Sequence, residues 1–310
     1  MHCPAETGNR ALHCPATGRK GIAMIQYSLP DITWHLPFNL ALSGLQHTAP
    51  ELFFEDVEIG SLYGCFPGCI MNGGRYFIGR KQTYDQIAGT FDRIGEAGLI
   101  TRLTFTNMLI RPEQFEDEYC NLILKAAQGR NVEVIVYLDE LDDYISSRYS
   151  FRRTLSTTRA LSGVDELNAM LDRYDMVVLD YNHNKDDEFL KKVNEPARLE
   201  VMPNETCQPN CPLRQQHYIH NSRCQLDNVE LPFSCAKEHK VNRFTSPQAD
   251  SPTLLDNDSV RRLYHTYGIR NYKIVGRSLP VAETLNSYFY YLIRSEYRSV
   301  VQRLLKDKIT

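Results

Sequence analysis

The sequence predicts an α/β fold, a single TIM-like (β/α) barrel with a long cysteine-rich loop after a late strand. Short runs rich in Val, Ile and Leu alternate with helical segments roughly eight times along the 310 residues. Continuously apolar strands of this kind are typical of a parallel sheet that is buried on both faces. No linker rich in Pro, Gly and Ser interrupts the alternation, so one barrel is favoured over two domains.

The periodicity of the apolar residues places each element. Strands are expected at the short apolar runs, which are 57–62, 101–106, 132–137, 153–156, 176–180, 198–202 and 271–275. Helices are expected where the period lengthens, at 84–97, 113–128, 138–146, 162–173, 186–193 and 281–305. Ser162 is the expected cap of the helix at 162–173. Residues 203–256 show little periodicity, and so long a structureless loop is uncommon unless it is functional or cross-linked.

Residues 1–23 differ in character from the rest of the chain. The motif His-Cys-Pro-Ala occurs twice, at His2 and His13, among glycines and prolines. Because the segment lacks apolar periodicity, we expect a disordered tail. The barrel domain is then expected to span residues 24–310.

The composition is that of an ordinary globular protein with a substantial core. The chain is 42% hydrophobic and 24% charged, with a formal net charge of −3. This balance argues against a protein that coats nucleic acid. No apolar run approaches the ~20 residues that cross a bilayer. The first thirty residues have no continuous apolar core of the kind found in an export signal, so a reducing cytoplasm is the expected location for the nine cysteines.

Four cysteines in the loop at 203–256 indicate a metal site. They are Cys207, Cys211, Cys224 and Cys235, which directly follow the strand expected at 198–202. A loop of thiolates can wrap an iron–sulfur cluster, and four thiolates can also hold a tetrahedral zinc. Only the first pair is closely spaced, which weakens the zinc alternative without excluding it. In a barrel, this loop would lie at the carboxyl ends of the strands, where active sites are built.

Two stretches resemble the collagenase-like peptidase family. Residues 267–277 read YGIRNYKIVGR, which is similar to the family's GI-x-x-x-KIEGR strand, and Leu199-Glu200-Val201 resembles its cluster-bearing strand. The likeness covers mainly residues 176–298. Val275 stands where the family has Glu, and the cysteine spacing differs, so the chain resembles a divergent member.

The resemblance implies a TIM-like barrel in which four cysteines hold a [4Fe-4S] cluster, with zinc as the alternative. It also implies an oxygen-independent, hydroxylation-type modification. Relatives act on ubiquinone precursors or on RNA bases, some with prephenate as oxygen donor. The expected substrate is therefore small and polar or anionic, such as a modified nucleic-acid base or an aromatic precursor. A partner subunit could complete the site.

Polar side chains at strand ends supply the candidate site. Asp180 and Glu205 are expected to move protons. The residues expected to bind substrate are Arg75, Asn107, Asn182, Arg214, His217, Lys273 and Arg277. Arg75 follows two glycines that allow a close backbone approach, and Arg214 and His217 are spaced to share one face of a helical turn.

Two alternatives to the iron–sulfur enzyme stay open. In one, zinc is a structural staple and the activity is unknown. In the other the protein is a peptidase, as the family name suggests, although no nucleophile–base motif is visible. A second Cys-x₃-Cys pair, Cys65 and Cys69, is expected to be buried rather than functional.

Overall fold

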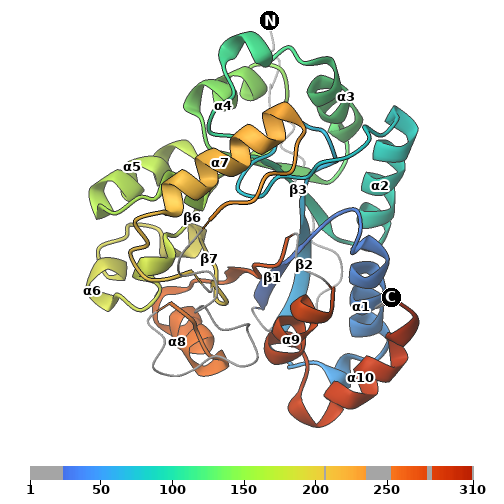
Figure 1. Ribbon diagram of the computed structural model, residues 1–310. Coiled ribbons are helices and arrows are strands. Elements are labelled where there is room, and N and C mark those ends of the chain that lie inside the picture. The colour runs from blue at the N-terminus through green and yellow to red at the C-terminus, as the bar shows by residue number, and fades with distance from the viewer. Residues whose placement is uncertain (1–23, 206, 235–252, 278–280, 309–310) are drawn as a thin grey trace, which may run out of the picture.

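A closed barrel of eight parallel strands forms the protein, so the predicted TIM-like fold is confirmed. The computed structural model describes residues 24–205, 207–234, 253–277 and 281–308. Each strand pairs with its neighbours in chain order, and β8 closes the ring against β1 (Figure 1). The strands are β1 (Ile25–Pro30), β2 (Val57–Gly64), β3 (Ile100–Phe105), β4 (Val132–Val136), β5 (Arg152–Leu155), β6 (Met176–Val178), β7 (Leu199–Val201) and β8 (Asn271–Lys273).

Helices cover the outside of this ring (Figure 1). The helices are α1 (Leu36–Thr48), α2 (Tyr84–Glu96), α3 (Glu118–Ala127), α4 (Asp139–Ser146), α5 (Val164–Arg173), α6 (Asp187–Leu190), α7 (Arg214–Asp227), α8 (Asn257–Tyr267), α9 (Val281–Leu292) and α10 (Arg298–Leu304). None of the helices in the described ranges is both long and apolar enough to cross a membrane. The predicted tail at 1–23 lies outside the described residues.

The first β/α pair was missed by the sequence prediction. β1 alternates apolar Ile25, Tyr27 and Leu29 with polar Gln26 and Ser28, which is the period of a strand, but no strand was predicted there. Its barrel position is nevertheless clear, because it pairs with both β2 and β8. α8 was also missed, although Asp256 caps it by accepting a hydrogen bond from the Ser259 N–H at 2.7 Å.

Three predicted helices have different bounds. The segment at 113–128 begins with a 3-10 turn, Pro112–Gln114, and α3 starts only after Asp117 caps it. The expected Ser162 cap is wrong, because Gly163 is the N-cap residue of α5 and makes no side-chain bond. The helix predicted at 281–305 is broken into α9 and α10, since Ile293 pairs with Phe53 between them.

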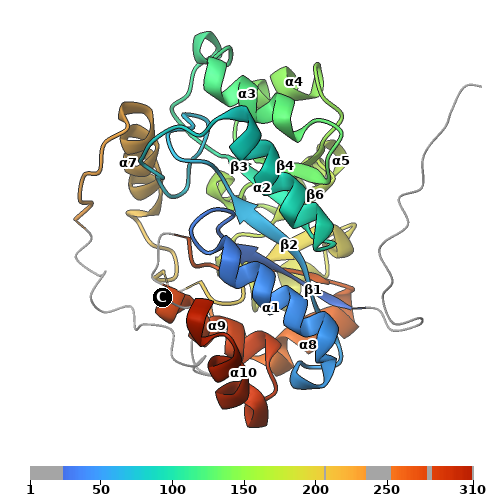
Figure 2. The ribbon, with the colours of Figure 1, turned by 90° about the vertical axis from the view of Figure 1, so that its right-hand side faces the viewer.

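The loop predicted at 203–256 contains a helix, α7. Figure 2 shows α7 standing at one end of the barrel, apart from the helices that cover its side. The buried residues of α7 are Asn221, Ser222, Cys224 and Gln225, which form no apolar stripe. Hydrophobic periodicity therefore could not detect this helix.

Polar contacts hold α7 to the loop at 72–77. Asn221 donates to the Gly74 carbonyl at 2.8 Å. Gln225 Oε1 accepts from Asn72 Nδ2 at 3.0 Å and from the Phe77 N–H at 2.5 Å. The side of α7 that faces the barrel is thus satisfied by hydrogen bonds rather than by apolar packing.

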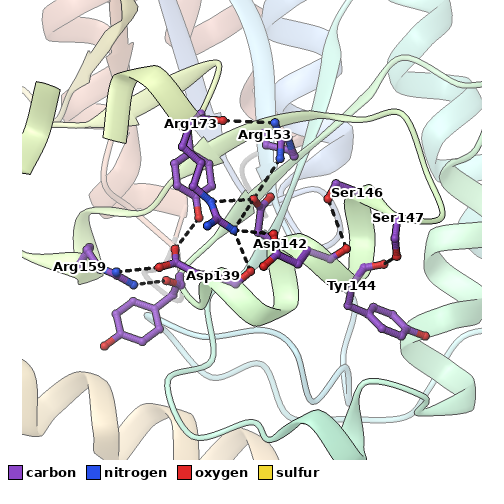
Figure 3. Close-up of polar contacts among 11 residues, drawn as sticks. Asp139, Asp142, Tyr144, Ser146, Ser147, Arg153, Arg159 and Arg173 are labelled. Carbon is purple, nitrogen blue, oxygen red and sulfur yellow. Dashed lines mark hydrogen bonds and ion pairs between the residues drawn. The ribbon is translucent and has the colours of Figure 1, made fainter. Parts of the chain in front are cut away.

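An acid–arginine cluster fastens α4 and α5 to β5 (Figure 3). Asp142 of α4 has no exposed side-chain surface and lies 3.0 Å from Arg153 of β5 and 3.2 Å from Arg173 of α5. Asp139 pairs with Arg159 at 3.0 Å and accepts from the Tyr174 hydroxyl at 2.8 Å. Two guanidinium groups therefore compensate the buried Asp142 carboxylate.

Replacing Asp142 with Asn should lower the free energy of unfolding by about 1.5–3 kcal/mol, because Arg153 and Arg173 lose a charged hydrogen-bond acceptor. The matched control is Asp143→Asn, whose side chain is 71% exposed and pairs with the same Arg173. An exposed pair is worth about 0–1 kcal/mol. Urea unfolding of both variants tests this, and equal losses would contradict it.

Candidate anion-binding site at the barrel mouth

A cavity opens at the carboxyl ends of the strands, beneath α7. It encloses about 890 Å³ of empty space, counting the part open to solvent. Its walls come from the ends of β2, β3, β5, β7 and β8, from α7, and from the segments that follow β2 and β7. The lining residues include Tyr63, Gly74, Arg75, Thr104, Thr106, Ser156, Thr157, Thr158, Met202, Glu205, Cys207, Cys211, Arg214, His217, Tyr218, Phe233, Lys273, Val275 and Arg277. We call it the mouth cavity.

Positive charge dominates the mouth cavity. Its lining holds the cationic side chains Arg75, Arg214, Lys273 and Arg277, and among the residues that the structure describes Glu205 is the only carboxylate in the lining. All five residues were predicted as site residues from the sequence. His217 also lines the cavity, and burial lowers its pKa to about 4, so its imidazole is neutral at pH 7. The electrostatic field in the cavity therefore favours an anion.

Arg277 is held in place by the loop after β2. Its guanidinium donates to Thr104 Oγ1 at 2.7 Å, to Asn72 Oδ1 at 3.2 Å and to the Gly73 carbonyl at 3.0 Å. Gly73 passes so close to β3 that a Cβ there would lie 2.2 Å from the Thr106 carbonyl oxygen. The absence of a side chain at Gly73 thus lets the loop approach the barrel. The three hydrogen bonds hold the Arg277 guanidinium in place without a ligand.

Lys273 lies deeper in the cavity. Its Nζ is 3.9 Å from Glu200 Oε2 and 4.3 Å from the centre of the Tyr63 ring. Burial lowers the pKa of Lys273 to about 7, and Glu200 only partly opposes this shift. Glu200 is itself committed to Arg102, with which it forms a buried ion pair. Lys273 can therefore gain or lose a proton near neutral pH.

Glu205 and Arg214 form a second, fixed unit. They pair at 3.1 Å, and Glu205 Oε1 also accepts from the Cys207 N–H at 3.0 Å. The Arg214 guanidinium lies over the rings of Tyr181 and Tyr218, at 4.0 and 5.1 Å from their centres. Although burial opposes it, Arg214 and these hydrogen bonds keep the pKa of Glu205 below its ordinary value. Glu205 is thus an ionised anchor that shapes the turn carrying Cys207.

Two lining groups keep unused hydrogen-bonding capacity. Arg75 is exposed, and its guanidinium makes no hydrogen bond or ion pair with the residues that the structure describes. Thr106 is 2% exposed, yet its hydroxyl has no partner within the described ranges. Both groups belong to the cavity wall, so both are available to a ligand.

Three predicted site residues do not line the mouth cavity. Asp180 uses Oδ1 to accept from the backbone and side chain of Asn182, at 2.8 and 2.7 Å. Asn182 Oδ1 in turn accepts from the Asn210 N–H. Asn107 donates to the carbonyls of Ile70 and Ser222. These residues shape the turns after β6 and β3, and their proposed catalytic and binding roles remain predictions.

The predicted metal ligands are divided. Cys207 and Cys211 both line the mouth cavity and influence each other electrostatically. Cys224 is fully buried on α7, with its sulfur 3.4 Å from His220 Nε2, and does not line the cavity. Cys235 lies outside the described residues. Within the described ranges, no three His, Cys, Asp or Glu side chains are grouped as metal ligands, so the predicted cluster remains a prediction.

The other cysteine pair is buried, as expected. Cys65 and Cys69 are 3% and 0% exposed, and the Cys69 sulfur lies 3.4 Å from that of Cys120 on α3. Burial raises the pKa of Cys69 and of Cys120, so both are neutral thiols in this packing.

A charged layer inside the barrel was missed by the sequence analysis. Arg102 of β3 lies between Glu200 of β7 and Glu133 of β4, 3.4 Å from the latter, and also donates to Thr154 at 2.9 Å. The available signal was a charged residue at the centre of strands that are otherwise apolar, as in Val132–Val136. Glu133 is the register partner of Arg102 on the neighbouring strand, whereas Glu200 reaches Arg102 only when the sheet closes into a barrel.

Comparison with known structures supports the fold. The U32 peptidase Mk0906 superposes with a TM-score of 0.51 and 13% sequence identity, over 86% of this chain and 98% of that one. U32 peptidases are the collagenase-like family that the sequence resembles. At this identity the likeness is one of fold alone. The chain matches no protein-family model and no curated protein.

The lowered pKa of Lys273 has a measurable effect on stability. Between pH 7 and the ordinary Lys pKa of 10.5, the unfolded chain binds a proton that the folded chain does not. The stability of the wild type relative to Lys273→Met should therefore rise with pH, by up to about 1.4 kcal/mol per pH unit. Urea unfolding at pH 7, 8 and 9 gives this difference. Lys191→Met, at an exposed ion pair, should keep the wild-type dependence, and a flat difference for Lys273→Met would refute the shift.

Proposed function

We propose that the protein binds a small anionic substrate in the mouth cavity and modifies it there. The observation that carries this proposal is the charge of the lining, in which four cationic side chains face a single carboxylate. That carboxylate is already paired with Arg214. Arg75 and Arg277 have no carboxylate partner within the described residues, and Lys273 lies 3.9 Å from Glu200, which is already paired with Arg102.

The lining suits a phosphate or carboxylate group. Arg75 offers a planar fork of donors that matches either group, and Lys273 offers an amine deeper in the cavity that donates a hydrogen bond and is partly protonated near pH 7. The Thr106 hydroxyl adds a neutral donor that has no partner within the described residues. The cations come from different strands and loops, so the fold brings the anion site together only when the barrel closes.

Lys273 is the group best suited to move a proton during such a modification. A general acid or base works best when its pKa is close to the working pH, and that of Lys273 is about 7. Glu205 was also predicted to move protons, but its carboxylate is ionised and held by Arg214 and the Cys207 N–H. We assign Glu205 a positioning role in the proposal.

Redox chemistry of the hydroxylation type would come from an iron–sulfur cluster at the rim. In this proposal Cys207 and Cys211 would be two of its thiolate ligands, which is supported by the position of both residues in the cavity lining. The described residues supply these two thiols at the cavity and no more. The other ligands of a [4Fe-4S] cluster would come from Cys235 and from a further thiolate, with zinc as the alternative metal.

The peptidase alternative has weaker support. The Cys–His contact on α7, Cys224 with His220, resembles a nucleophile–base pair in distance only. The Cys224 side chain is 0% exposed and lies away from the mouth cavity. A peptide bond would have no access to that sulfur in this arrangement.

Anion binding can be measured directly with sulfate, which does not titrate near neutral pH. Calorimetry should detect sulfate binding, and Arg75→Gln should weaken it by roughly 10-fold, since a hydrogen bond to a charged group is worth about 1.5–3 kcal/mol. Arg80→Gln is the matched control, because Arg80 is exposed in the same segment and does not line the cavity. Equal affinities for the two variants would contradict the proposed site.

Metal content tests the proposed cofactor. Protein purified without oxygen should contain iron and sulfide, and Cys207→Ser and Cys211→Ser should each lose most of both. Cys224→Ser should keep them if the packing of α7 persists, because this thiol points away from the cavity. Stoichiometric zinc without sulfide would identify the structural-staple alternative, and protein free of both metals would overturn the cofactor assignment.

A further inference from the structure

A second hollow lies next to the mouth cavity, beside α7 and the segment that follows β2. Its walls come from the turn after β1, the segment after β2, α7 and the segment after α7, and the hollow contains about 1090 Å³ of empty space, counting the part open to solvent. Its apolar lining residues are Trp34, Tyr76, Phe77, Ile78, Leu231, Pro232 and Phe233. We call it the aromatic groove. It shares Arg75, His217 and Phe233 with the mouth cavity, so these three residues form the boundary between two neighbouring spaces.

The groove presents open ring faces to solvent. Trp34 is 67% exposed and meets Phe77 edge to face, with ring centres 4.7 Å apart. Phe233 stacks on His217 at 4.5 Å with the rings nearly parallel. Leu231 is 49% exposed in the same wall. Large side chains left this open beside a cavity mark a binding surface rather than a packed core.

The position of Trp34 is built into the backbone. Asp31, which follows β1, has a φ of 75°, in the left-handed region that is unusual for a non-glycine residue. Its Oδ1 accepts from the Thr33 N–H at 2.6 Å and from the Trp34 N–H at 3.1 Å. These bonds hold a strained turn that carries Trp34 at the groove, and strained turns of this kind are common at binding sites.

Arg75 connects the groove to the anion site. Its guanidinium lines both spaces and is uncommitted within the described ranges. If Arg75 binds the charged group of a ligand, the rest of that ligand would lie either in the mouth cavity or in the aromatic groove. The polar residues that line the groove are few, and Glu230 among them already accepts from the Tyr76 hydroxyl at 3.2 Å.

We infer that the aromatic groove binds the flat ring of the same anionic substrate whose charged group lies in the mouth cavity. The substrate class is then an aromatic or heteroaromatic phosphate or carboxylate. This inference rests on the proposed function, because the ring is located by the anion that Arg75 and Lys273 hold. It adds a ring-binding subsite to the charged one.

Trp34 makes the test direct, because it is the only tryptophan in the chain. The probes are inorganic phosphate, phenyl phosphate and cyclohexyl phosphate. All three should bind by calorimetry, but only phenyl phosphate should change the Trp34 emission strongly. Phenyl phosphate should also bind roughly 3- to 10-fold more tightly than cyclohexyl phosphate, as expected for stacking on aromatic rings.

Two variants separate the ring from the charge. Phe77→Leu should remove the preference for phenyl over cyclohexyl phosphate and keep the affinity for phosphate, with Trp34 emission as the readout. Trp34→Leu, measured by calorimetry, should also remove the preference for phenyl phosphate. Because Trp34 is exposed, this substitution should leave the fold intact. Arg75→Gln should weaken the binding of all three probes.

The outcomes distinguish the two proposals. If phosphate binds and phenyl phosphate binds no more tightly than cyclohexyl phosphate, the ring subsite is refuted and the anion site stands. If neither phosphate nor sulfate binds, the anion site fails, and the inference fails with it. If phenyl phosphate does bind more tightly, benzoate and adenosine monophosphate are compared next. Tighter binding of benzoate identifies an aromatic carboxylate as the substrate class, and tighter binding of adenosine monophosphate identifies a nucleotide phosphate.

Discussion

The buried ion pair between Arg102 and Glu200 is the constraint on which the mouth of the barrel depends. The two residues are 3% and 1% exposed, on strands that lie far apart in the ring. Burying either charge alone would cost several kcal/mol, so the pair is compatible only with a closed sheet. Thr154 accepts from a further nitrogen of Arg102, and Glu133 lies 3.4 Å from the Arg102 Nε as an ion-pair partner. Lys273 lies at the edge of the same layer, 3.9 Å from Glu200. Closure of the barrel therefore fixes the charges around Lys273, and with them the protonation of its amine.

Above this layer, the site is built from hydrogen bonds rather than from apolar packing. The loop at 72–77 touches β3 through Gly73, receives Arg277 from the segment after β8, and is held from above by Asn221 and Gln225. Each of these contacts joins segments that are distant in sequence. Replacing one residue of this set would leave a buried partner unsatisfied, so the geometry of the mouth is set by the whole network.

The sequence was sufficient for the barrel and for much of the cavity lining, but not for its geometry. Glu205, Lys273 and Arg277 were predicted at strand ends, Arg75 after a pair of glycines, and Arg214 and His217 on one helical turn of the cysteine loop. All six line the cavity. Strand ends alone cannot say which side chains turn inward, and Asp180, Asn182 and Asn107 fold back onto neighbouring backbone instead. α7 escaped because its buried face is polar and carries no apolar period. β1 was overlooked although its polar and apolar residues alternate as in a strand. Arg102 and Glu200 escaped because their pairing is a property of the closed ring.

The polar seat of α7 has a consequence for the rate at which ligands reach the cavity. Water can take over the hydrogen bonds of Asn221, Ser222 and Gln225 when the helix lifts, whereas an apolar face would lose its burial outright. Local opening of this helix therefore costs less than opening any of the helices that bury an apolar stripe, such as α2. The proposed ligand could then exchange while α7 is transiently released and the strands keep their register. The rate of exchange would depend on the local stability of α7 and not on the stability of the whole barrel.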